Sequence, residues 1–218
     1  MTDKSPPNRC RLVLIAPRDE SAETFGPRLL EAAAGGDIAS IIIPARGDEA
    51  SFQDFAAPVV RLAQTAGIAA IVADDSRIAG RVGADGIHLQ AGKDELGEAV
   101  GRWQGKMIVG AGGAATRDDA LELGETQPDY IFFGRFGFDT KPEPHRRNLA
   151  LGQWWAAVVE IPCIVLGGSD VASVEAVAAT GAEFVALSSA VFGDGVDPRA
   201  AVGRANAILD RTAPAFGD

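Results

Sequence analysis

Short apolar runs recur eight times along this chain of 218 residues, and longer amphipathic stretches separate them. The runs are apolar throughout instead of alternating with polar residues, which is typical of strands buried on both faces of a parallel sheet. Most of them end in Gly, Ala, Ser or Asp, residues that suit a turn into a helix. The expected strands are residues 11–16, 39–45, 69–74, 86–89, 106–112, 130–134, 162–168 and 184–189.

The stretches between these runs have the pattern of helices. Thr116, followed three residues later by Asp119, resembles a capping box, and Asp170 is a further candidate N-cap. The expected helices are about residues 22–34, 51–66, 76–82, 94–103, 116–124, 151–159, 171–179 and 198–212.

Eight strand–helix units predict an α/β fold with a single (β/α)8 TIM barrel. An open doubly wound sheet is the alternative. The barrel is favoured because it usually has eight such units, and because "IAPRDES" after the first strand contains no glycine-rich fingerprint. No linker divides the chain. We expect a flexible N-terminal segment at residues 1–10, a barrel domain at 11–212 and a C-terminal tail at 213–218.

Charge and hydropathy narrow the class of ligand. A formal net charge of −10 argues against non-specific nucleic-acid binding, although local backbone N–H groups can still hold a small anion. No apolar run approaches the roughly 18 residues of a membrane span, and "MTDKSPPNRC" lacks the apolar region of a signal peptide. Cys10 and Cys163 are expected to be reduced. We expect a cytoplasmic enzyme or binding protein for small molecules, and a homo-oligomer is left open.

Two pairs of small residues mark a predicted phosphate site. In a (β/α)8 barrel the site lies at the carboxyl ends of the strands, and the loops after strands seven and eight commonly bind phosphate. Gly167-Gly168 and Ser188-Ser189 fall at those two ends. Glycine lets the backbone approach an oxyanion closely, and serine adds a hydroxyl donor. The alternative is that these residues only make tight turns.

Two further features are candidates for function. The stretch "FGFDTKPEPHRRN" (136–148) is a long charged loop after the sixth predicted strand, and long loops in compact domains are often functional. His88 ends the fourth predicted strand. It either orients the neighbouring loop or acts as a base near the phosphate.

Three segments resemble a known family. "RVGADGIHLQ" (81–90), "PDYIFFGRFGFDTKP" (128–142) and "PCIVLGGSDVASVEAVAATGAEFVALSSAVFG" (162–193) are similar to segments of thiamine-phosphate synthase and its relative, thiazole tautomerase. The string G-A-D-G-[IV]-H-L is the most specific part, and the resemblance runs from residue 11 to about residue 203. The family fold is a (β/α)8 barrel, in agreement with the count of strands.

The resemblance implies an activity. Thiamine-phosphate synthase joins hydroxymethylpyrimidine pyrophosphate to hydroxyethylthiazole phosphate, and Mg²⁺ and basic groups stabilise the departing pyrophosphate. By this resemblance Asp74 would be a magnesium ligand, and Asp94 a second one if its loop is one residue longer. Thr140 and Lys141 retain part of the family's T-x-T-K signature, and Lys141 would contact the pyrophosphate. The thiazole phosphate would bind at the glycine and serine turns.

Other positions depart from the family pattern. Arg46 stands where the family has a lysine and is, with Lys141, an expected catalytic cation. Ile42 replaces a glutamine, and the asparagine and arginine after the third strand are replaced at Ala73 and Asp75. The resemblance therefore predicts a synthase whose pyrophosphate side is eroded, unless Arg146 and Arg147 of the charged loop supply replacements. A phosphoester-binding relative, either tautomerase-like or non-catalytic, is the alternative. The family's tautomerase relies on a histidine in the turn after the fifth strand, and Ala114-Ala115 in this chain weaken that version.

Overall fold

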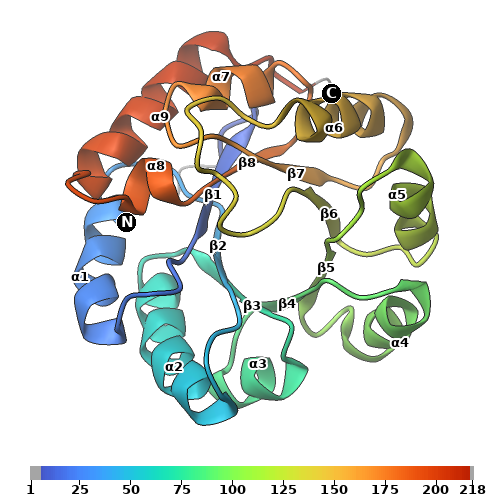
Figure 1. Ribbon diagram of the computed structural model, residues 1–218, viewed down its shortest axis with the longest axis horizontal. Coiled ribbons are helices and arrows are strands. Elements are labelled where there is room, and N and C mark those ends of the chain that lie inside the picture. Colours follow the sequence, from blue (N-terminus) through green and yellow to red (C-terminus); the bar gives the residue numbers. More distant parts are fainter. Residues whose placement is uncertain (1–5, 217–218) are drawn as a thin grey trace.

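Eight parallel strands close into a barrel in the computed structural model, which describes residues 6–216. Each strand pairs with the next along the chain, and the eighth pairs with the first (Figure 1). The predicted single (β/α)8 barrel is therefore confirmed. The strands are β1 (Arg11–Ile15), β2 (Ser40–Ile43), β3 (Ala69–Ala73), β4 (Gly86–Leu89), β5 (Ile108–Ala111), β6 (Tyr130–Phe133), β7 (Cys163–Leu166) and β8 (Phe184–Leu187).

Helices surround the barrel and follow the strands in turn. Thr116 and Asp119 form the predicted capping box, in which each side chain accepts a hydrogen bond from the other residue's backbone N–H. The helices are α1 (Ala22–Ala33), α2 (Glu49–Thr65), α3 (Ser76–Val82), α4 (Lys93–Trp103), α5 (Arg117–Gly124), α6 (Arg146–Val158), α7 (Ser173–Ala178), α8 (Ser189–Phe192) and α9 (Pro198–Thr212).

Two helical predictions were wrong in their bounds, and one short helix was missed. Helix α6 begins at Arg146, five residues earlier than expected, because the His145 side chain caps it by accepting the Arg147 N–H. Helix α7 is shorter than predicted, and Asp170 accepts the Ala172 N–H in a turn before the helix. The short helix α8 was not predicted at all, since it begins at Ser189, immediately after the strand.

The apolar side chains form two layers, because successive strand residues point to opposite faces of the sheet. One layer lies between the strands and the helices and includes Leu12, Leu14 and Trp155. The other fills the inside of the barrel and includes Ile15, Ile42, Tyr130 and Phe132. The interior is therefore packed, and a ligand has room only at the ends of the barrel.

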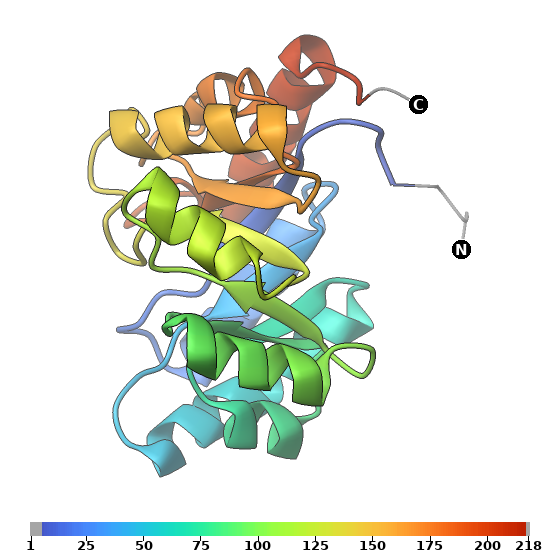
Figure 2. The same ribbon diagram turned by 90° about the vertical axis from the view of Figure 1, so that its right-hand side faces the viewer.

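The two ends of the described chain meet at one end of the barrel. Arg9 is buried, its Nε donates to Asp210 Oδ1 over 2.8 Å, and its backbone pairs with Ala215. Figure 2 shows the blue and red ends of the chain on one side and the yellow β6–α6 loop on the other. The predicted boundaries at residues 10 and 213 stay predictions, and residues 1–5 and 217–218 of those terminal segments lie outside the described residues.

Among the helices of the described residues 6–216, none combines the length and the hydrophobicity that a transmembrane segment requires.

Candidate active site

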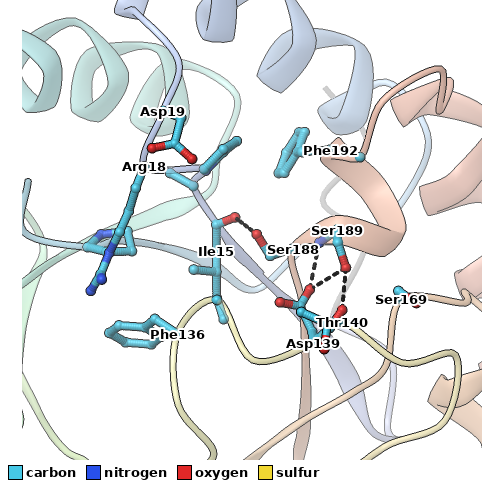
Figure 3. A pocket seen from close by; sticks show the side chains of 15 residues that line it. Ile15, Arg18, Asp19, Phe136, Asp139, Thr140, Ser169, Ser188, Ser189 and Phe192 are labelled. Carbon is cyan, nitrogen blue, oxygen red and sulfur yellow. Dashed lines mark hydrogen bonds between the residues drawn. The ribbon is translucent and has the colours of Figure 1, made fainter.

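A pocket of about 410 Å³ opens at the carboxyl ends of β1, β6, β7 and β8, where the site of a (β/α)8 barrel is expected. Its walls come from the segments that follow these strands and from Pro44 after β2. Figure 3 shows Asp139, Ser188 and Ser189 together on one side of the pocket, and Arg18 extending toward the side of Phe136. The lining includes Ile15, Arg18, Asp19, Phe136, Asp139, Thr140, Ser169, Ser188, Ser189 and Phe192.

The serine pair after β8 is held by its neighbours. The Ser188 hydroxyl donates to the Ile15 carbonyl over 3.0 Å and so joins the end of β8 to the end of β1. The Ser189 N–H donates to Asp139 Oδ2 over 2.7 Å, and the Ser189 hydroxyl lies 2.7 Å from the same carboxylate oxygen. Asp139 is only 5% exposed. An internal carboxylate therefore occupies the donors of Ser189.

The glycine pair after β7 is covered by the same loop. The Gly168 N–H donates to Ser173 Oγ over 3.0 Å, while the Gly167 N–H belongs to the β7–β8 ladder and donates to the Ala186 carbonyl. A Cβ on Gly168 would lie 2.0 Å from the Pro142 carbonyl oxygen, so only glycine lets the loop approach this closely. The structure thus brings both predicted turns to one place, with residues 139–142 packed over them.

Thr140 and Lys141 lie in this covering segment and are exposed. Thr140 lines the pocket. The backbone carbonyl of Lys141 accepts the Ser169 N–H over 2.7 Å, which fixes the main chain at this residue, and its side chain is exposed. Lys141 does not line the pocket, but both of its partners in this stretch, Thr140 and Ser169, do.

Arg46 stabilises the β1–α1 loop through hydrogen bonds to its backbone. Its Nη2 donates to the carbonyls of Arg18 and Glu20, the latter over 2.6 Å, and its guanidinium lies 3.9 Å from the centre of the Phe55 ring. Burial lowers the pKa of Arg46 below its ordinary value. These contacts hold the loop that carries Arg18 and Asp19 to the pocket.

Arg18 and Asp19 are pocket residues that sequence reasoning missed. Both are exposed and both line the pocket directly after β1. The sequence signal that could have identified these two residues is a charged pair soon after the end of a strand, because the carboxyl ends of barrel strands carry functional residues.

Asp74 lies at the end of β3 with a left-handed backbone, φ 59°. Aspartate tolerates this conformation better than most residues, and such backbone outliers gather at functional sites. Asp74 Oδ1 accepts the Gln90 N–H over 2.9 Å, while the neighbouring Asp75 caps α3. Asp74 is exposed and does not cap α3.

Magnesium needs few protein ligands, because it keeps several waters and is often bound through one or two carboxylates and substrate phosphates. The exposed Asp74 suits this arrangement, and Asp94 lies exposed in the first turn of α4. Residues 6–216 contain no cluster of three or more His, Cys, Asp or Glu arranged to hold a metal ion. A magnesium ion at this face would therefore need phosphate oxygens of a substrate or water among its ligands.

His88 points into the barrel interior. It is fully buried, its Nδ1 lies 2.9 Å from the Tyr130 hydroxyl, and the rings of Phe132 and Phe136 pack against it. Burial lowers the pKa of His88 to about 3, so the imidazole is neutral at physiological pH. By the order of strands, β4 lies across the barrel from β8. This position favours a packing role for His88.

The fifth strand makes room for these rings. A Cβ on Gly110 would lie 2.0 Å from Tyr130 Cζ, and a Cβ on Gly112 would lie 2.6 Å from His88 Nε2. Glycine at both positions of the β5 end is therefore required by the aromatic filling of the barrel.

Acid is expected to destabilise the protein through His88. The folded-state pKa near 3 lies below the ordinary value of 6.5, so stability is complete above pH 6.5 and falls as the pH drops toward 3. The expected slope from this group is about 1 kcal/mol per pH unit. Urea unfolding at pH 7.5, 5.5 and 4.5 measures it. His88→Asn should flatten the slope and His145→Asn, at an exposed position, should not; equal slopes in all three proteins would contradict the assignment.

Comparison with known proteins identifies the family of this chain. The family model for thiamine monophosphate synthase matches residues 12–191. The chain belongs to this family. The match confirms the resemblance carried by the three sequence segments.

The alignments with relatives cover nearly the whole chain. A thiamine-phosphate synthase of Hyphomonas neptunium is 32% identical over 223 aligned residues, which cover 98% of this chain and 100% of that protein. One of Rhodospirillum centenum is 31% identical and covers 92% of this chain and 98% of its own length. The solved structure of thiamine phosphate pyrophosphorylase from Pyrococcus furiosus superposes with a TM-score of 0.76 at 22% identity, covering 95% of this chain and 98% of its own. That structural likeness concerns the fold.

Proposed function

We propose that this protein is a thiamine-phosphate synthase-like transferase, which condenses hydroxymethylpyrimidine pyrophosphate with a thiazole phosphate and releases pyrophosphate. The observation that carries the proposal is the end-to-end match to thiamine-phosphate synthases, which covers 98% of this chain and 100% of one relative. The pocket at the carboxyl ends of β1, β6, β7 and β8 supplies a place for the reaction.

The thiazole phosphate is assigned to the turns after β7 and β8. Ser169 and Ser189, one from each turn, line the same pocket as Thr140, and Gly168 precedes Ser169. Backbone N–H groups and hydroxyls are the donors that phosphate oxygens accept. The small-molecule phosphoester substrates of the family fit a site of this size and donor content.

The pyrimidine pyrophosphate is assigned to the region between Asp74 and Lys141. Asp74 and Asp94 would hold Mg²⁺, which when bound neutralises negative charge on a departing pyrophosphate. Arg18 of the β1–α1 loop lines the pocket and would provide one cation, and the exposed Lys141, next to the pocket residue Thr140, would provide another. Arg46 is bound to the β1–α1 loop and acts by positioning Arg18.

We also propose that the pyrophosphate site of this protein has fewer contacts than the family pattern provides. Ile42 is fully buried inside the barrel and offers no hydrogen bond, and Ala73 is equally buried at the end of β3. A cation aimed at the charge that develops on a leaving group is worth several kcal/mol of transition-state stabilisation. Arg18 and Lys141 are the residues that would carry this role here, and they also orient the two substrates.

A direct assay tests the function. Purified protein is incubated with both phosphorylated precursors and Mg²⁺, and thiamine phosphate is measured by chromatography. Product should form with both precursors present, and should fall to background when either precursor or Mg²⁺ is omitted. Thermal stabilisation by a phosphoester without turnover would overturn the proposal in favour of a non-catalytic phosphoester-binding protein.

A further inference from the structure

Asp139 occupies the place assigned to the phosphate of the substrate. Its carboxylate Oδ2 lies 2.7 Å from both the N–H nitrogen and the hydroxyl oxygen of Ser189. Its main-chain carbonyl is also 2.7 Å from the Ser189 hydroxyl. The side chain comes from the β6–α6 loop, drawn in yellow in Figure 1, and points toward Ser189 in Figure 3. A carboxylate therefore takes the donors that a phosphate oxygen would use.

The neighbouring turn is occupied by the same segment. Ser169 donates its N–H to the Lys141 carbonyl over 2.7 Å, and the Gly168 N–H donates to Ser173 Oγ over 3.0 Å. An incoming phosphate thus finds protein acceptors already on the donors of both turns. It must replace at least some of them to bind.

A phosphate cannot share Ser189 with Asp139. Two anions at hydrogen-bond distance from one donor repel each other strongly, and more so where water is excluded. Asp139 is 5% exposed, so solvent does little to weaken that repulsion. Phosphate binding and the Asp139–Ser189 contact are therefore mutually exclusive.

The segment around Asp139 has the features of a part that can move. Phe136 is 4% exposed and anchors the start of the segment against His88 and Phe132. Gly137 then adopts a left-handed backbone, φ 80°, and Phe138 is 61% exposed. Asp139 has the only buried side chain among residues 137–141, so a shift of this part of the loop would break mainly the hydrogen bonds that the loop makes with Ser189 and Ser169, while Phe136 stays packed.

We propose that Asp139 lowers the affinity of the site for phosphate as an internal competitor of the phosphorylated substrate. The Asp139 carboxylate satisfies Ser189 when no ligand is bound, and a phosphoester binds by displacing it. The inference rests on the proposed phosphate site at Ser189. It goes beyond the family reaction by assigning a role to a residue of this chain that sequence motifs did not single out.

Phosphate binding tests the competition. Isothermal titration with inorganic phosphate is compared for the wild-type protein, Asp139→Ala, Asp139→Asn and the control Glu143→Ala. Glu143 is an exposed carboxylate of the same loop, so its removal changes the net charge equally. Asp139→Ala should bind phosphate at least about tenfold more tightly than the wild type, and Glu143→Ala should stay within about twofold of it.

Thermal unfolding supplies a second readout. Asp139→Ala leaves the Ser189 N–H without its acceptor, while the Ser189 hydroxyl keeps the main-chain carbonyl of residue 139. The loss lowers the melting temperature in phosphate-free buffer, and added phosphate should restore it. Asp139→Asn keeps the shape of the side chain and removes the charge, so it carries the test if the alanine variant does not fold. Its phosphate affinity should also rise.

Two results would overturn the inference. One is phosphate binding in both Asp139 variants that is no tighter than in the wild type, and the other is an equal gain in Glu143→Ala. Formation of thiamine phosphate is measured separately. A tenfold gain in phosphate affinity without turnover in any variant would count against the proposed function alone, and turnover without that gain would count against the inference alone.

Discussion

Replacement of Asp74 by asparagine is expected to lower Mg²⁺-dependent formation of thiamine phosphate by at least about 100-fold, or about 2.7 kcal/mol of transition-state stabilisation. Asparagine tolerates the left-handed backbone at this position and can still accept the Gln90 N–H, so the fold should be retained. What it removes is the negative charge that would hold the metal. Initial rates over a range of Mg²⁺ concentrations measure the effect.

Asp75→Asn is the matched control. Asp75 caps α3, and asparagine is an equally good N-cap, so this neighbouring change removes one charge and little else. Its rate should stay within about twofold of the wild type. If Asp74→Asn keeps the wild-type rate and magnesium dependence, Asp74 is not a metal ligand.

Replacement of Gly168 by alanine is expected to destabilise the protein by about 3 kcal/mol and to abolish turnover. The added Cβ would lie 2.0 Å from the Pro142 carbonyl oxygen and 2.7 Å from that of Lys141, and both atoms belong to the backbone. The covering segment must therefore move away from β7, which breaks the bond from Ser169 to Lys141. Urea unfolding measures the stability, and limited proteolysis between residues 136 and 148 reports the release of the loop.

Gly80→Ala is the control for this substitution. Gly80 lies in α3, and a Cβ added there meets no atom within 4 Å. Alanine at a helical position of this kind should stabilise the protein by about 0.5–1 kcal/mol. If Gly168→Ala is as stable and as protease-resistant as the wild type, the close approach of the loop to Gly168 is not maintained in solution.

The barrel could be predicted from the sequence because its strands are buried on both faces, which leaves short, continuous apolar runs that repeat eight times. The start of α6 could not, since Arg146 and Arg147 read as part of a charged loop and the capping by His145 is visible only in the structure. Helix α8 was missed for a related reason: it is four residues long and starts where the strand ends.

The two turns after β7 and β8 could be located from the sequence because small residues at strand ends mark the carboxyl face of a barrel, and their binding of phosphate stays a prediction. The occupation of Ser189 by Asp139 could not be, since the two residues are 50 positions apart and meet only through the path of the β6–α6 loop. His88 was placed correctly at a strand end, but its partner Tyr130 lies 42 residues further on.

The glycines at the end of β5 have an evolutionary consequence. Gly110 and Gly112 leave space that Tyr130 and His88 fill from the strands on either side, so the size of the residue on one strand limits the size of the residue on the next. A relative with a larger, polar side chain at position 110 would need a smaller residue at position 130, because the two side chains would otherwise overlap. Divergence at these positions should therefore proceed by paired substitutions, and relatives with a larger residue at the first should carry a smaller one at the second.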